Sequence, residues 1–133
     1  MPSDSEVPIE HEHDVVVARQ KGRQLAAALG FSTTDQTLLA TAISELARNI
    51  IRYAGHGRVQ LRCLETSGRR GVLIVASDEG PGIPNLDLAM RDGYSTGNSL
   101  GVGLPGARRL VDEFEITSTP GVGTTVTLRK WLP

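Results

Sequence analysis

The sequence is poor in the features that mark secreted proteins and proteins that bind nucleic acid. Its 133 residues include one cysteine, so no disulfide can form within the chain. Aromatic residues make up 4% of the sequence, too few for a surface on which single-stranded bases stack. The net charge of -1 provides no overall attraction to nucleic acid or to anionic lipid. We therefore expect neither nucleic acid nor a membrane among the binding partners.

Long apolar runs are also missing, since no stretch approaches the ~20 residues that a helix needs to cross a bilayer. The N-terminal stretch MPSDSEVPIEHEHD is acidic and has no apolar centre, so it does not match a secretory signal peptide. We expect a cytoplasmic protein that folds as a single domain over residues 1–133, with residues 1–6 flexible.

Hydrophobic periodicity predicts three helices and five strands. A capping box formed by Thr33 and Gln36 is expected to open the second helix, and Arg69 and Arg70 are expected at a solvated hairpin tip. Pro8 favours an edge position for the first strand because it cannot donate a ladder hydrogen bond. The expected strands are 7–10, 58–64, 71–77, 114–119 and 124–131, and the expected helices are 14–29, 33–54 and 102–113, with a further short helix near 86–90. This order predicts an α+β fold with helices on a mostly antiparallel sheet.

The second helix carries a possible catalytic pair. Glu45 and Asn49 are four residues apart, so they lie on one face about a turn from each other and can serve one site. The alternative is that both belong to a solvated polar stripe with Arg48 and Arg52. Asparagine is unfavourable inside a helix because its amide competes with the backbone, which hints at a function for Asn49.

Fifteen glycines are the one unusual excess, and most of them follow Asp78. The first cluster, DEGPGI at 78–83, comes directly after a predicted buried strand. A carboxylate there can accept a hydrogen bond from an amino group such as that of adenine, and the glycines let a ligand ring approach the backbone. A simple Gly/Pro turn is an equally good interpretation of this cluster taken alone.

The second cluster, GVGLPG at 101–106, matches the dinucleotide-binding fingerprint, but its context does not. A polar loop precedes it instead of a strand, and no acidic residue follows about 20 positions on. Glycines at a helix start still leave backbone N–H groups free to hold phosphate oxygens. A third cluster, GVGTT at 121–125, is by itself a hairpin turn.

These motifs, in this order, resemble the N, G1, G2 and G3 boxes of the GHKL ATPase superfamily. The segments ATAISELARNI, DEGPGIP and GYSTGNSLGVGLPGARRLVDEFEI look most like the RsbT-like switch-protein serine/threonine kinases of bacterial stress signalling. The resemblance covers nearly the whole chain. It implies the Bergerat fold of histidine kinase-like ATPases, a two-layer α/β sandwich with the nucleotide held between the helices and a lid.

The resemblance also implies residue roles. Glu45 would be the general base that takes the substrate serine proton, and Asn49 would bind Mg²⁺. Asp78 would recognise the adenine amino group, helped by Thr124 through a water. Gly80 and Gly82 would admit adenine and ribose. The remaining expected nucleotide-binding residues are Ile83, Leu104 and the lid residues Gly97, Gly101, Val102 and Gly103.

The function implied by the resemblance is an ATP- and Mg²⁺-dependent protein serine/threonine kinase. Its substrates would be STAS-domain proteins of a stressosome, and it would also bind and activate a PP2C-type phosphatase. The main alternative is a nucleotide-dependent module that sequesters a sigma factor, as anti-sigma factors do. A stand-alone histidine-kinase catalytic domain is a third interpretation, and it is disfavoured because no dimerisation segment with a phospho-accepting histidine is present.

Overall fold

The computed structural model describes residues 4–83, residue 90 and residues 103–133. Their elements follow the predicted order of one strand, two helices, two strands, one helix and two strands. The elements are β1 (Ser5–Ile9), α1 (Glu12–Leu29), α2 (Thr33–Tyr53), β2 (Gly57–Thr66), β3 (Arg69–Asp78), α4 (Gly103–Arg109), β4 (Glu113–Thr119) and β5 (Gly123–Trp131). The short helix expected near 86–90 falls almost wholly outside the described residues.

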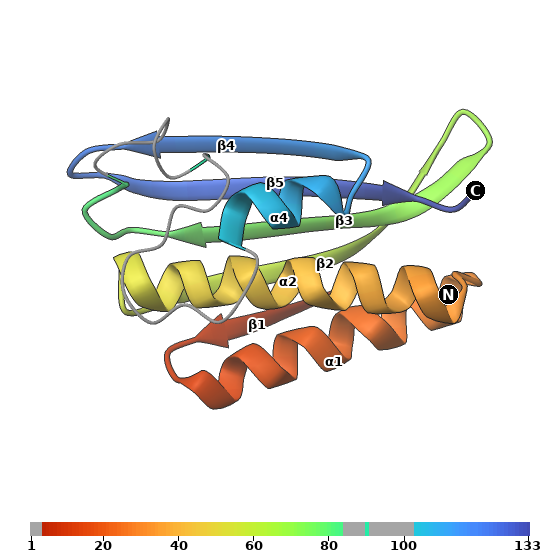
Figure 1. Cartoon of the computed structure of the whole chain (residues 1–133), viewed down its shortest axis with the longest axis horizontal. Helices are drawn as coiled ribbons and strands as arrows, with labels where there is room; N and C mark the ends of the chain where they lie inside the picture. Colours follow the sequence, from red (N-terminus) through yellow and green to blue (C-terminus); the bar gives the residue numbers. More distant parts are fainter. Residues whose placement is uncertain (1–3, 84–89, 91–102) are drawn as a thin grey trace.

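The strands form one five-stranded antiparallel sheet in the order β1-β2-β3-β5-β4. All three described helices lie on the same face of this sheet, with α2 between α1 and α4 (Figure 1). The predicted α+β fold and its two layers are confirmed. None of the helices in the described ranges is long and apolar enough to cross a membrane.

The core lies between the sheet and the helices because alternate strand residues point toward the helical layer. From the strands it contains Val59, Leu61, Val72, Ile74, Ala76, Val126 and Leu128, all nearly inaccessible to solvent. From α2 it contains Leu39, Ile43, Leu46, Ala47 and Ile50, which recur at helical spacing. This apolar face of α2 fixes the helix against the sheet and so decides which way its polar residues point.

The starts of the two long helices differ in detail from the expected ones. In α1 the Asp14 carboxylate accepts hydrogen bonds from the backbone N–H groups of Glu10 and His11, at 2.8 and 2.9 Å. These bonds hold the pKa of Asp14 below its usual value, because they favour the charged form. In α2 the cap is Ser32, whose hydroxyl accepts from the Asp35 N–H at 3.1 Å, so the predicted cap at Thr33 was wrong by one residue.

The sheet also corrects three predicted boundaries. Arg69 and Arg70 belong to β3 and pair with Thr66 and Glu65, so only Ser67 and Gly68 form the hairpin tip. The first strand begins at Ser5, inside the segment expected to be flexible, and it occupies the predicted edge of the sheet. Helix α4 ends at Arg109, short of the predicted residue 113. By Asp112 the chain already pairs with β5, because the backbone N–H of Asp112 donates to the Arg129 carbonyl oxygen.

Candidate active site

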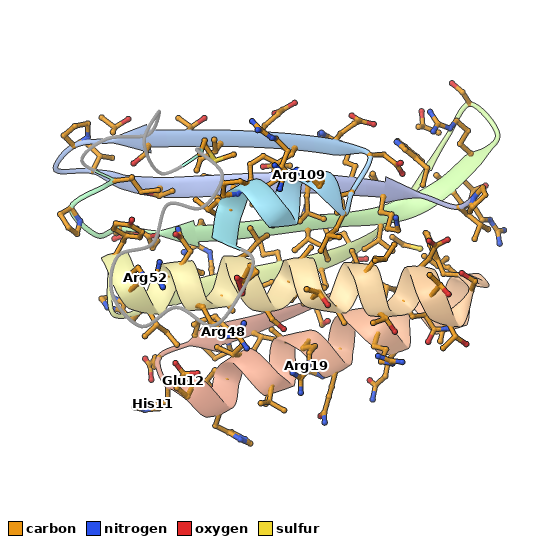
Figure 2. All side chains as sticks on the ribbon, viewed as in Figure 1. His11, Glu12, Arg19, Arg48, Arg52 and Arg109 are labelled. Atoms are coloured by element: carbon orange, nitrogen blue, oxygen red, sulfur yellow. The ribbon has the colours of Figure 1, made fainter. Side chains whose placement is uncertain are left out.

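Two predicted site residues lie on the C-terminal half of α2. Glu45 and Asn49 are 5% and 8% exposed, so they are not part of a solvated stripe. Arg48 and Arg52, in contrast, are exposed, and Figure 2 shows them on the helix side of the molecule. The polar-stripe interpretation therefore holds for the arginines but not for Glu45 and Asn49. A carboxylate and an amide buried on neighbouring turns are typical of a functional site.

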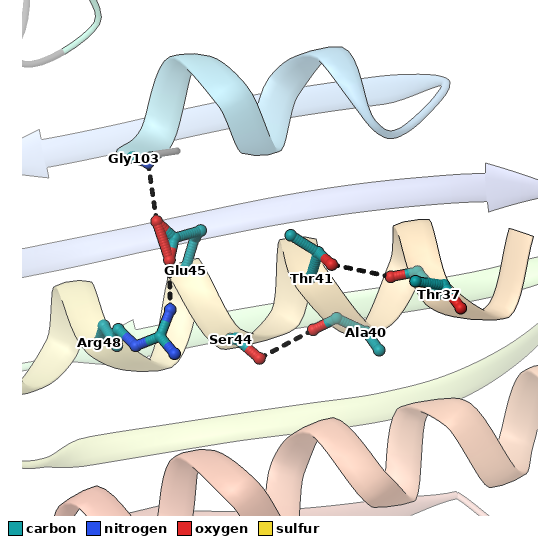
Figure 3. A network of polar contacts seen from close by, with 7 residues as sticks. All are labelled: Thr37, Ala40, Thr41, Ser44, Glu45, Arg48 and Gly103. Carbon is teal, nitrogen blue, oxygen red and sulfur yellow. Dashed lines mark hydrogen bonds and ion pairs between the residues drawn. The ribbon is translucent and has the colours of Figure 1, made fainter. Parts of the chain in front are cut away.

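The Glu45 carboxylate is engaged at both oxygens, as Figure 3 shows. Its Oε1 accepts a hydrogen bond from the backbone N–H of Gly103 at 2.7 Å, across 58 residues of sequence. Its Oε2 accepts from Nη1 of Arg48, also at 2.7 Å. These two donors are what make burial of the charge tolerable, since an unpaired buried carboxylate is strongly destabilising. Each oxygen keeps a second lone pair, so the carboxylate can still accept a proton from a substrate group.

Asn49 lies one turn beyond Glu45 and makes no side-chain hydrogen bond to any described residue. Its amide oxygen is thus available to a ligand or a metal ion. No group of three or more His, Cys, Asp or Glu residues that could hold a metal occurs within the described ranges. A single amide oxygen such as that of Asn49 fits Mg²⁺ held in part by nucleotide phosphates, because that ion usually takes one or two protein ligands and keeps several waters.

The other end of the candidate site is built around Asp78, the last residue of β3. Asp78 is 8% exposed, and its Oδ1 accepts from the N–H groups of Gly80 at 3.0 Å and Thr124 at 3.3 Å. Asp78 and Thr124 are direct partners in the β3–β5 ladder, which explains how residues 46 apart in sequence meet. Among the described residues no donor reaches Oδ2, so this oxygen is available to a ligand's amino group.

A hydroxyl network beside Asp78 includes one residue that sequence analysis missed. Ser118 of β4 accepts from the backbone N–H of Ile83 at 2.7 Å, and its oxygen lies 2.9 Å from Oγ1 of Thr124. Ser118 and Thr124 are ladder partners in the β4–β5 pair. A predicted register for the β4–β5 strand pair could have identified Ser118, because it places Ser118 directly opposite Thr124 on the same face of the sheet.

The predicted glycines of the first cluster are required by close contacts within the chain. A Cβ on Gly80 would come within 2.5 Å of the Cβ of Ala54, at the end of α2. Gly82 has a φ of +85°, and a Cβ there would come within 2.8 Å of the Thr119 carbonyl oxygen. These glycines thus allow the loop after β3 to pack against both α2 and the β4–β5 turn.

The predicted lid is described only at its C-terminal end. Gly97, Gly101 and Val102 lie outside the described residues. Gly103 begins α4 with a φ of +71° and gives its N–H to Glu45, while Leu104 is 5% exposed and packs in the core. Of the predicted lid residues, therefore, the structure brings Gly103 to the Glu45 carboxylate.

Comparison with known proteins places this geometry in a family. A family model described as histidine kinase-, DNA gyrase B- and HSP90-like ATPase matches residues 34–133. The serine/threonine-protein kinase RsbT of Bacillus subtilis (strain 168) is 50% identical over 132 residues, which cover 99% of each chain. An anti-sigma F factor of Thermoanaerobacter sp. (strain X514) is 29% identical over 120 residues, covering 86% of this chain and 83% of the relative.

Solved structures share the fold at lower sequence identity. The RsbU and RsbW domains of a Mycobacterium tuberculosis protein superpose with a TM-score of 0.64 and 19% identity, over 98% of this chain and 33% of that one. The mycobacterial sensor histidine kinase MprB superposes with a TM-score of 0.56 and 16% identity, over 97% of both chains. The sequence match and the shared fold agree, and the chain belongs to the histidine kinase-, DNA gyrase B- and HSP90-like ATPase family.

Proposed function

We propose that this protein is an ATP- and Mg²⁺-dependent serine/threonine-protein kinase whose substrates are STAS-domain proteins of a bacterial stress-signalling complex. The observation that carries the proposal is the buried Glu45 carboxylate on α2, one turn from Asn49 and hydrogen-bonded to Gly103 at the start of α4. The 50% identity to a serine/threonine-protein kinase over 99% of the chain supports the reaction type. The other predicted residue roles are part of the same proposal.

In the proposed reaction, Asp78 binds ATP by accepting a hydrogen bond from the adenine amino group at Oδ2. Asn49 would hold Mg²⁺ through its amide oxygen, and the ion would neutralise charge on the phosphates. Glu45 accepts the proton of the substrate serine hydroxyl as the serine oxygen bonds to the γ-phosphorus. The bond from that phosphorus to the β–γ bridging oxygen breaks, which leaves ADP and phosphoserine. The protein thus contributes positioning, a proton acceptor and charge stabilisation.

We infer that ATP binding also changes the hydrogen-bond partners of Glu45. Its Oε1 is held by the Gly103 N–H and its Oε2 by Arg48. A phosphate oxygen of bound ATP competes for the Gly103 N–H, since backbone amides at a Gly-rich helix start bind phosphates well. Loss of that contact frees Oε1 to face the substrate hydroxyl. In this proposal nucleotide binding and exposure of the base are therefore linked.

The STAS and PP2C partners are proposed from the sequence resemblance, and the relatives support partner-switching protein interactions in general. The proposal includes a second role, in which the kinase binds and activates a PP2C-type phosphatase, and it places the protein in the cytoplasm, where ATP is abundant. A sequestering module is the alternative function. It is favoured by the anti-sigma F factors among the relatives, such as that of Bacillus licheniformis (strain ATCC 14580), which is 32% identical over 80% of this chain.

Phosphotransfer separates the two functions. The full-length protein is incubated with γ-labelled ATP, Mg²⁺ and a purified STAS-domain protein encoded beside it. We expect an acid-stable phosphoserine on the STAS protein, and no label when a chelator removes Mg²⁺. A label that is lost in acid would indicate histidine phosphorylation. An ATP-dependent complex with a sigma factor and no transfer to any STAS protein would favour the sequestering module.

A further inference from the structure

Three hydrogen-bonded groups connect the loop after β3 to Thr124, which lies beside Asp78. The backbone N–H of Ile83 lies 2.7 Å from Oγ of Ser118, and Ser118 Oγ lies 2.9 Å from Oγ1 of Thr124. Ile83 and Thr124 are 4% and 3% exposed, so solvent does not replace these contacts easily. The Thr124 N–H is bonded in turn to Asp78 Oδ1 at 3.3 Å.

Chemistry fixes the direction of the first bond in this chain. The Ile83 N–H can only donate, so Ser118 Oγ is its acceptor. A hydroxyl that accepts a hydrogen bond becomes polarised and is a better donor through its own hydrogen. Either hydroxyl can be the donor in the contact between Ser118 and Thr124, and this polarisation favours Ser118. With Ser118 as the donor, the hydrogen of the Thr124 hydroxyl is free to point elsewhere.

We propose that Ser118 is a positioning residue for nucleobase recognition: by donating to Thr124 it makes the Thr124 hydroxyl a donor beside the acceptor oxygen of Asp78. This inference rests on the proposed function, since it assumes that Asp78 and Thr124 face a nucleobase. Without Ser118 the Thr124 hydroxyl has no fixed direction and can rotate to act as an acceptor. Ser118 touches neither base nor phosphate in this scheme and acts only through Thr124.

The resulting pattern of one acceptor beside one donor matches adenine. Adenine presents an amino donor at N6 and, next to it, an acceptor nitrogen at N1 on one edge and at N7 on the other. Guanine presents a carbonyl at position 6 and a ring N–H at position 1, so the Watson–Crick edge is reversed and its carbonyl oxygen would face the Asp78 carboxylate. Thr124 reaches the adenine nitrogen directly or through one water, and in either case its hydrogen must point into the pocket.

The test compares ATP with analogues that lack one ring nitrogen. Dissociation constants for ATP, 1-deaza-ATP and 7-deaza-ATP are measured by calorimetry on the full-length protein. We expect the wild type to bind one of the two analogues about 3- to 10-fold more weakly than ATP, the size of one neutral hydrogen bond. In Ser118→Ala this ratio should fall to about 1, because the missing nitrogen no longer meets a directed donor.

Three further variants distinguish positioning from a general structural effect. Ser118→Thr keeps the hydroxyl and should restore the ratio. Thr117→Ala removes a hydroxyl from the opposite face of the same strand and should leave the ratio unchanged. Thr124→Val should abolish the discrimination, and adding Ser118→Ala to it should change the ratio no further if the two residues act as one chain.

The outcomes separate this inference from the proposed function. Equal affinity for ATP and both analogues in the wild type would overturn the positioning role, as would an unchanged ratio in folded Ser118→Ala. In those cases ATP binding and transfer to serine would stand. If the wild type binds no ATP at all, or if Asp78→Asn leaves ATP affinity unchanged, the adenine pocket itself is assigned wrongly.

Discussion

The two ends of the candidate nucleotide site hold their carboxylates in opposite ways. At the proposed adenine end, backbone N–H groups fix one oxygen of Asp78, and no described donor reaches the other. At the proposed catalytic end, both oxygens of Glu45 are already bonded, one to Gly103 and one to Arg48. The oxygen without a donor at the first end can meet a ligand donor with both lone pairs, whereas each Glu45 oxygen has one lone pair left for a substrate proton. Two carboxylates thus differ in their proposed roles, adenine recognition for Asp78 and proton acceptance for Glu45, according to the donors around them.

The largest expected effect is at the catalytic end. Glu45→Gln should reduce the rate of phosphotransfer by about 10²- to 10⁴-fold, because the amide cannot take the serine proton. ATP affinity should change little, since the Asp78 end is untouched. Transfer measured at saturating ATP gives the rate, and calorimetry gives the affinity. Glu115→Gln, on the open face of the sheet, is the matched control and should keep full activity. Normal phosphotransfer by Glu45→Gln would exclude Glu45 as the base.

The loop conformation at the proposed adenine end depends on Gly82. Gly82→Ala should lower the free energy of unfolding by about 2–4 kcal/mol, since the new methyl group meets the Thr119 carbonyl and the backbone conformation is strained. Gly121→Ala is the control: its φ of +77° is also left-handed, but a Cβ there has open space. It should cost only about 1 kcal/mol. Urea unfolding of both variants measures the difference, and equal costs would mean that the loop moves away freely.

Asp78→Asn tests the proposed hydrogen bond from adenine to the Asp78 carboxylate, with little change in side-chain shape. The amide offers a weaker neutral acceptor, or presents a donor to the adenine amino group, so ATP affinity should fall about 10- to 150-fold. The fold should survive, because no apolar packing is removed. Calorimetry with ATP and co-sedimentation with a STAS protein measure the two properties. Loss of partner binding in the folded variant would show that nucleotide and partner share one surface.

The smallest expected effect is on stability, when Arg48 is removed from the Glu45 carboxylate. Arg48→Ala removes one of the two donors on Glu45 and should lower the free energy of unfolding by about 1 kcal/mol. The value is modest because the Arg48 side chain is 44% exposed and solvent screens the pair. Arg52→Ala, one turn along on the same exposed side, should stay within about 0.5 kcal/mol of the wild type. A loss of ATP affinity in Arg48→Ala would show that the two ends are coupled.

The sequence predicted the fold well because its periodic patterns are local. The alternation of β2 and the helical spacing of α2 gave the element order, and the ordered motifs indicated Glu45, Asn49 and Asp78. The contacts that complete the site are not local. Gly103 reaches Glu45 across 58 residues, and Ile83 reaches Ser118 across 35. Such pairs depend on strand register and on where α4 sits, and no spacing rule for a single element can provide them.

The cap of α2 and the hairpin tip show a smaller limit. Ser32 and Thr33 are both good capping residues, and only the backbone geometry decides between them. Arg69 and Arg70 extend β3 because the two-residue turn at Ser67 and Gly68 is tight enough to let the strands pair to their ends. Element existence was therefore predictable, whereas the boundaries depended on tertiary pairing.

The edge position of β1 has a consequence for how the molecule behaves at high concentration. An exposed edge strand is a template on which another chain can add a strand, and repeated addition leads to aggregates. Pro8 lies in the five-residue β1, where it contributes no N–H to any ladder. This strand is therefore a poor template for further growth of the sheet, and replacing Pro8 by valine would supply the missing donor and favour self-association along that edge.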